Sequence, residues 1–151
     1  MDKSKKFRTL RRFFRGDESD EGTYFAYSAT LRIFGVLPDL QVITDTLGVK
    51  PMRALHKGDR LRPRSPPLTH DRWHYRPDVS ETEPLEVHIN ALWVAIKDHS
   101  DFIKNLKRRA TVDVFLGYRS ICESAGFEVP HTCLKLFVEL EIPFEVSIII
   151  A

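Results

Sequence analysis

The sequence predicts an α+β domain in which helices pack on one face of a largely antiparallel or mixed sheet, as a two-layer sandwich. Some segments alternate with a period of two, as strands do, whereas others repeat apolar residues every three or four positions, as helices do. In addition, residues 38–51 and 130–143 are helix-like stretches, each bounded by prolines. Each follows a strand and precedes an extended segment, which predicts two β-α-β halves joined by central helices.

The first half is predicted to contain a strand, a helix and an extended exit. Residues 24–34 alternate between two faces, which indicates a strand. A helix then begins at Asp39 and ends at Gly48, a residue suited to the left-handed backbone that closes many helices. The apolar face of this helix comprises Leu40, Ile43 and Leu47.

The central part is predicted to be helical. A short strand at residues 73–76 is followed by a helix that starts at residues 82–84, where proline is tolerated. A second helix follows, with Ser100 as its N-cap and basic residues in its last turn. The buried face of the first of these helices comprises Leu85, Ile89, Leu92, Trp93 and Ile96.

The second half is predicted to begin with a strand at residues 110–118 and a short strand at residues 127–129. A helix follows Pro130. The last strand, residues 144–150, is an almost continuous apolar run, which predicts a central position in the sheet. The inward face of the helix comprises Cys133, Leu136, Phe137 and Leu140.

The chain of 151 residues is long enough for one domain with its own core. We expect this domain to span residues 23–151 and residues 1–22 to form an N-terminal tail. Residues 1–16 carry seven basic and one acidic residue, a net charge of +6, and residues 17–21 carry four acidic residues. We expect a solvated tail, with a basic amphipathic helix that binds anionic lipid or nucleic acid as the alternative.

Composition argues against several classes of protein. The sequence contains no run of about 18 apolar residues, which a membrane-spanning helix would require. Residues 1–14 lack the apolar region and cleavage site of a secretory signal. The two cysteines, Cys122 and Cys133, do not make a disulfide framework and are expected to be buried thiols. We therefore expect a cytoplasmic protein.

The candidate site is the segment at residues 51–77, which is basic and rich in proline. Residues 52–76 carry seven basic and two acidic residues, a net charge of +5, whereas residues 77–151 carry seven basic and twelve acidic residues, a net charge of −5. A cluster of guanidinium groups beside an indole can bind phosphate, carboxylate or an acidic protein surface. The alternative is that these arginines are solvated and pair with the acidic C-terminal region. The candidate binding residues are Arg53, His56, Lys57, Asp59, Arg60, Arg62, Arg64 and Trp73.

We expect no metal, cofactor or catalytic residue. His70 and His74 are spaced so that their imidazoles share one face of a strand or helix, but the surrounding arginines would oppose a dication. The sequence contains no GxSxG motif, Walker loop or GxGxxG motif. His88, His99 and His131 are expected to pack or to form local hydrogen bonds.

Several short motifs occur in a characteristic order. They are SATLRIFG, LGVKP, HKGDR, RWHY, LEVHINALWVAI, VDVFLGYRS and GFEVPHTCLKLFVELEIPFEVSI. In this order, over residues 24–150, the chain resembles a bacterial family of uncharacterised domains, domain of unknown function 4279. The chain departs from the pattern after Gly117, where RSICESAG replaces the glycine-rich turn we would expect. Because the family has no established activity, the resemblance implies a fold and no reaction.

Three functions are compatible with these features. We favour a small binding or interaction module, of accessory or toxin-immunity type, whose basic loop at residues 53–76 binds an acidic protein or a small anion. The first alternative is a nucleic-acid-binding protein that uses the tail and the loop, with Trp73 and Tyr75 stacking on bases. The second is an enzyme in which His56, Asp59 and the arginines converge on a pocket for an anionic substrate.

Overall fold

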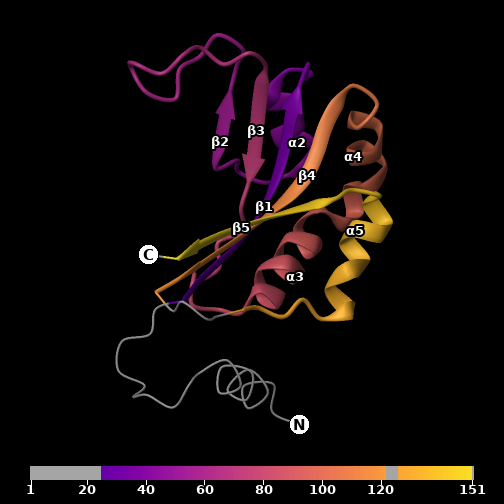
Figure 1. Ribbon diagram of the computed structural model, residues 1–151. Coiled ribbons are helices and arrows are strands. Elements are labelled where there is room, and N and C mark those ends of the chain that lie inside the picture. The colour runs from indigo at the N-terminus through magenta and orange to yellow at the C-terminus, as the bar shows by residue number, and fades with distance from the viewer. Residues whose placement is uncertain (1–24, 122–125, 151) are drawn as a thin grey trace, which may run out of the picture.

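The computed structural model describes residues 25–121 and 126–150 (Figure 1). The expected tail at residues 1–22 and Cys122 lie outside the described residues. The described strands form one five-stranded sheet in the order β2-β3-β1-β4-β5. These strands are β1 (Phe25–Gly35), β2 (Arg53–Leu55), β3 (Asp71–Tyr75), β4 (Ala110–Ser120) and β5 (Phe144–Ile150).

The sheet is mixed, as the sequence predicted. Strand β1 pairs antiparallel with both β3 and β4, and β2 pairs antiparallel with β3. Strand β5 pairs with β4 in parallel. The two longest strands, β1 and β4, have 11 residues each and lie side by side at the centre of the sheet.

Two β-α-β units are present, and the prediction of two halves is confirmed. Strands β1 and β2 are both antiparallel to β3, so they are parallel to each other, and α2 (Leu40–Leu47) connects them. Strands β4 and β5 are parallel neighbours connected by α5 (Leu134–Leu140). The units differ because β3 lies between the two parallel strands of the first unit, whereas the strands of the second are adjacent.

The four α-helices of the described residues contribute to a single core on one face of the sheet (Figure 1). Helices α3 (Leu85–Ile96) and α4 (Ser100–Leu106) join the two halves, and η1 (Lys97–His99) and η2 (His131–Cys133) are short 3-10 turns. Within the described residues, no helix is long and apolar enough to cross a membrane. The core combines strand residues such as Leu31, Val114 and Leu116 with helix residues such as Ile43, Ile89, Leu92, Ile103 and Leu136.

Helix α2 begins and ends as its sequence predicted. The Asp39 carboxylate accepts a hydrogen bond from the backbone amide of Gln41 at 2.9 Å, which caps the N-terminus. Gly48 closes the helix in a left-handed conformation, with φ of 64°, and its amide donates to the Thr44 carbonyl.

The expected central position of the last strand was wrong, because β5 is an edge strand of the described sheet. Its apolar side chains are 39–58% exposed, namely Phe144, Val146, Ile148, Ile149 and Ile150. An apolar run shows only that most side chains of a strand avoid water, and β5 still carries the charged Glu145. Such a run does not show that a second strand lies beside it.

Three local expectations also needed correction. Residues 127–129 form no strand. Ser100 does not cap α4, because its hydroxyl donates to the Lys97 carbonyl at 2.7 Å and the N-cap residue is His99. The buried face of α3 includes His88, which is 1% exposed, whereas Trp93, expected on that face, is only partly buried.

Candidate functional site

The sheet has a second face that carries the polar residues of the strands. Side chains alternate along a strand, so the neighbours of buried residues such as Ile33 and Val112 point away from the helices. Pairing aligns these outward residues across the strands, with Arg32 opposite His74 on one side and opposite Asp113 on the other. Arg53 on β2 is in turn opposite His74. We call this surface the open face.

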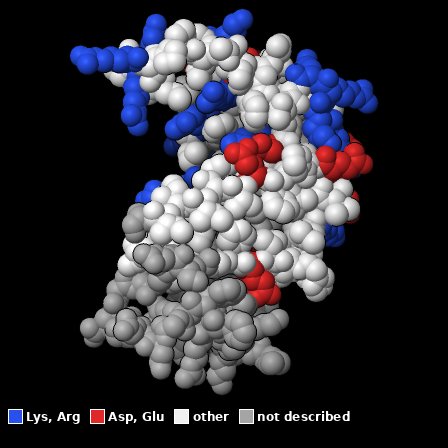
Figure 2. All heavy atoms as spheres, viewed as in Figure 1, with Lys and Arg blue, Asp and Glu red and all other residues white. Residues whose placement is uncertain are grey.

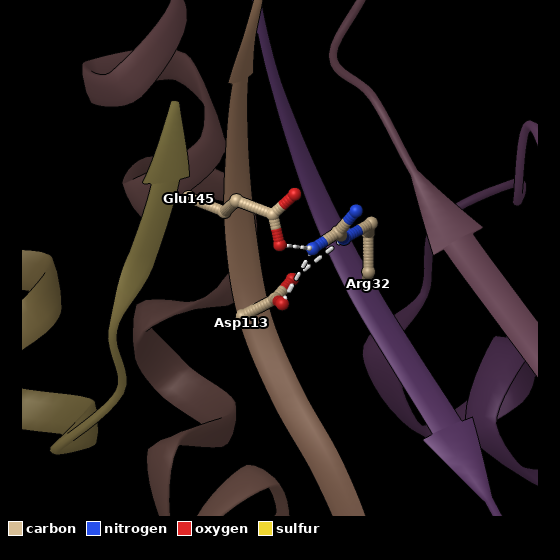
Figure 3. Close-up of polar contacts among 3 residues, drawn as sticks. All are labelled: Arg32, Asp113 and Glu145. Carbon is tan, nitrogen blue, oxygen red and sulfur yellow. Dashed lines mark hydrogen bonds and ion pairs between the residues drawn. The ribbon is translucent and has the colours of Figure 1, made fainter. Parts of the chain in front are cut away.

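Arg32 is held on the open face by two carboxylates (Figure 3). Its Nε and Nη2 donate to the two oxygens of Asp113 at 2.7 and 2.6 Å, and Nη2 also donates to Glu145 at 2.8 Å. The guanidinium also lies 4.8 Å from the ring centroid of Phe115. These bonds raise the pKa of Arg32 above its usual value, so its charge is permanent and already neutralised.

A cavity of about 170 Å³ lies on the same face. It is lined by two residues of β1, two of β3 and the residue before β3, and all five are partly buried. Burial lowers the pKa of His74 to about 4, and the charges of Arg53, Arg32 and Arg72 act in the same direction. The His74 ring is therefore neutral near pH 7. The lining residues are Arg32, Phe34, His70, Arg72 and His74.

The motif HKGDR forms the predicted tight turn at the start of the loop between β2 and β3. The backbone amide of His56 donates to the Asp59 carboxylate at 2.8 Å, and the amide of Asp59 donates to the His56 carbonyl at 3.0 Å. Gly58 has φ of 93°, a conformation that side chains with a Cβ rarely adopt. Asp59 and Gly58 therefore stabilise the turn, Asp59 through its hydrogen bond and Gly58 through its backbone conformation.

The rest of this loop is held by backbone hydrogen bonds. Gly58 donates to the Leu68 carbonyl at 2.9 Å, and Leu68 donates back to the Asp59 carbonyl at 2.8 Å. The Leu68 side chain is 8% exposed, so it anchors the second half of the loop, which leads back to β3. Because residues 53–55 and 71–75 of the predicted basic loop are strands, the loop itself comprises residues 56–70, and from here on the name basic loop refers to these residues. The loop projects from one end of the sheet, away from α3 and α5 (Figure 1).

Asp71, at the start of β3, fixes the base of the basic loop. Its carboxylate accepts the backbone amide of Lys57 at 2.8 Å and that of Leu37 at 3.3 Å. These two donors lower the pKa of Asp71, with the Lys57 amide as the largest cause. A single carboxylate thus ties the loop that precedes α2 to the turn that opens the basic loop.

The lysine and arginine side chains of the basic loop have no acidic partner within the described part of the chain, whereas the His56 imidazole lies 3.8 Å from the Asp71 carboxylate. The Arg60 guanidinium donates to the Ser65 carbonyl, which fixes its direction. Arg62 and Arg64 are exposed. Figure 2 shows Lys and Arg side chains gathered over the end of the molecule where β2, β3 and the basic loop lie. The alternative that these arginines pair with the acidic C-terminal region therefore finds no support in residues 25–121 and 126–150.

The structure separates the predicted site residues into three groups. Arg53 lies on the open face, next to His74. Trp73 points to the opposite side of the sheet, where it is fully buried and its indole Nε1 donates to Thr44 at 3.0 Å. It offers no surface for a ligand. The remaining six residues belong to the basic loop and are His56, Lys57, Asp59, Arg60, Arg62 and Arg64.

His56 and Asp59, the pair required by the enzyme hypothesis, meet through the backbone of the turn and do not line the cavity. His70 and His74, the spaced pair considered for a metal, do both line it. Among the residues that the structure describes, no group of three or more His, Cys, Asp or Glu side chains could hold a metal ion.

Sequence reasoning missed Arg32 and Phe34 as cavity residues. A signal for Arg32 was present, because it is the one charged residue in the strand at residues 25–35. In the same way, the alternation of Arg72 and His74 with Trp73 and Tyr75 indicates that the polar pair and the aromatic pair face opposite sides.

The fold and the site define a class of small α+β domain. Helices cover one face of a mixed sheet, the other face is open and polar, and a basic loop projects from one end of the sheet. Residues 25–151 match the model of the family described as Domain of unknown function (DUF4279), and the chain belongs to this family. No curated protein and no solved structure gave a significant match.

Proposed function

We propose that this protein is a binding module that holds an acidic partner protein through the basic loop. The observation that carries the proposal is that the exposed arginines of this loop have no carboxylate partner within the described chain. A guanidinium can bind a carboxylate through two parallel hydrogen bonds, so an acidic protein surface suits the exposed Arg62 and Arg64.

The order of the loop supports this proposal. Hydrogen bonds between Gly58, Asp59 and Leu68 and the contact of Arg60 with Ser65 hold the backbone that presents the cations. A loop already fixed in its binding conformation loses little conformational entropy on association. Exposed ion pairs contribute only about 0–1 kcal/mol each, so we expect several of them to act together and the affinity to fall with salt.

Nucleic-acid binding is less well supported. Its stacking residues were to be Trp73 and Tyr75, but Trp73 is fully buried and Tyr75 is packed against the helix-side core. The basic loop can still contact phosphates, so the two functions are separated by experiment below. Within the binding class, our finer hypothesis is an accessory or toxin-immunity role in the cytoplasm, which a toxin-like neighbouring reading frame would support.

The test is a pull-down with the full chain as bait. A triple charge reversal, Arg60→Glu, Arg62→Glu and Arg64→Glu, should abolish capture of acidic proteins identified by mass spectrometry. The matched control is Arg119→Glu with Lys135→Glu, which reverses two exposed cations, one paired with Ala26 at the opposite end of the sheet from the loop and one on α5. We expect this control to capture the same proteins as the wild type.

Two results would overturn the proposal. One is unchanged capture by a triple variant whose circular dichroism and unfolding midpoint match the wild type. The other is loss of capture when the sample is treated with nuclease, with retention of a single-stranded oligonucleotide at low salt, because this would assign the loop to nucleic acid.

A further inference from the structure

We propose that the cavity on the open face is a separate binding site for a compact oxyanion, a small carboxylate or phosphate compound that carries an apolar ring. Its lining combines a guanidinium without a carboxylate partner, two imidazoles and a phenyl ring within about 170 Å³. Apart from His70, the last residue of the basic loop, the lining belongs to β1 and β3, so binding here does not require the loop's partner and is distinct from the proposed function.

The pairing of β1 with β3 builds the cavity. Arg32 lies directly opposite His74, and Phe34 lies directly opposite Arg72, so the four side chains form two neighbouring cross-strand pairs on one face. His70, which precedes β3, closes one end, with its ring centroid 5.7 Å from that of Phe34. The walls therefore come from regular strands, whose side-chain directions are fixed by the sheet.

The two arginines in the lining have different roles. Arg32 is held by Asp113 and Glu145, so its charge is already compensated and it serves as a fixed wall. Arg72 forms no ion pair with the described residues and is partly buried, so its charge remains available. A partly desolvated guanidinium with no counter-ion favours a planar, two-oxygen anion such as a carboxylate or phosphate.

The neighbouring groups determine which anions fit. His74 is neutral near pH 7, so its ring adds hydrogen-bonding capacity without charge, while the exposed Arg53 adds a second positive charge beside it. The rings of Phe34 and His70, whose centroids are 5.7 Å apart, form the aromatic part of the lining. Since an enclosed cavity of about 150 Å³ accepts benzene, a pocket of about 170 Å³ that is partly open to solvent has room for one ring, with its anionic group at the open polar edge.

The test uses phenyl phosphate and benzoate as probes, with inorganic phosphate for comparison. We would titrate each into the ¹⁵N-labelled full chain and follow amide chemical shifts in β1 and β3. Arg72→Gln should weaken binding by about ten- to a hundredfold, because hydrogen bonds to charged groups contribute about 1.5–3 kcal/mol. Phe34→Leu keeps an apolar side chain and should weaken the ring-bearing probes while leaving inorganic phosphate unchanged.

The matched control is Arg119→Gln, which removes an exposed arginine further along β4 and should leave binding unchanged. The triple reversal at Arg60, Arg62 and Arg64 should also leave it unchanged, which separates this site from the loop. Whichever ring-bearing probe binds more tightly identifies the anionic group. The proposal is overturned if neither probe shifts the amides of β1 and β3, or if Arg72→Gln and Arg119→Gln weaken binding equally.

Discussion

Arg32, the one charged residue of β1, connects three strands through Asp113 on β4 and Glu145 on β5 (Figure 3). The two carboxylates differ in exposure, since the Asp113 side chain is 10% exposed and that of Glu145 is 61% exposed. Removing the guanidinium would therefore leave a nearly buried carboxylate without its two donors, whereas removing Glu145 would affect a solvated group.

We predict that Arg32→Gln lowers the free energy of unfolding by about 3 kcal/mol, at the lower end of the range for breaking a buried ion pair because Arg32 is itself partly exposed. Glu145→Gln should cost about 0–1 kcal/mol. Urea denaturation of both variants measures the difference, and Arg32→Gln combined with Asp113→Asn should recover part of the loss. Equal losses of unfolding free energy in the two single variants would show that the Arg32–Asp113 pair contributes no more to stability than the Arg32–Glu145 pair.

At the scale of elements, the basic loop depends on its anchor in β3. The Asp71 carboxylate accepts the amides of Lys57 and Leu37, which belong to two different loops. Because these amides favour the charged carboxylate, the pKa of Asp71 is lowered. The stabilisation is therefore fully present above the ordinary carboxyl pKa and is lost as pH falls through the lowered value.

We predict that Asp71→Ala destabilises the protein by about 1–2 kcal/mol, since two backbone amides near the surface lose their acceptor. Limited proteolysis should cut the variant within residues 56–70 faster than the wild type, because the base of the loop is released. The difference in unfolding free energy should narrow as the pH is lowered below about 4. A difference that stays constant down to low pH would contradict the role assigned to the ionised carboxylate.

The elements that local sequence determines were predictable. Asp39 and Gly48 give the start and stop of α2, and alternation gives β1 and β4. The edge position of β5 was not predictable, because it depends on which strand pairs with β4 on its other side. Similarly, residues 127–129 have strand-like composition but no pairing partner in the described sheet.

The candidate site was predictable only where the chemistry is local. The turn at Gly58 and the cluster of cations in residues 56–64 lie within a short stretch of sequence. The cavity requires Phe34 to lie opposite Arg72, a long-range register that no local pattern gives. Trp73 was placed with its basic neighbours, but strand geometry turns it to the other face of the sheet, where it bonds to Thr44.

At the scale of the whole molecule, the net charge of +2 conceals a separation between a basic segment at residues 52–76 and an acidic region at residues 77–151. In the described residues, the cations of the basic loop do not pair with that acidic region. Under the proposed function, the unpaired cations of the basic loop would steer an acidic partner toward that loop. At ionic strength near 0.1 M this steering acts over about 10 Å, so only the region around the loop is affected.

The central claim is that the basic loop binds an acidic protein surface, and the most direct test is a titration of the ¹⁵N-labelled full chain with a glutamate-rich peptide at low salt. We predict that the largest amide shifts fall within residues 56–70, that they diminish as salt is added, and that the triple reversal at Arg60, Arg62 and Arg64 removes them. Largest shifts on α3 or α5, or shifts that persist in the triple variant, would contradict the claim.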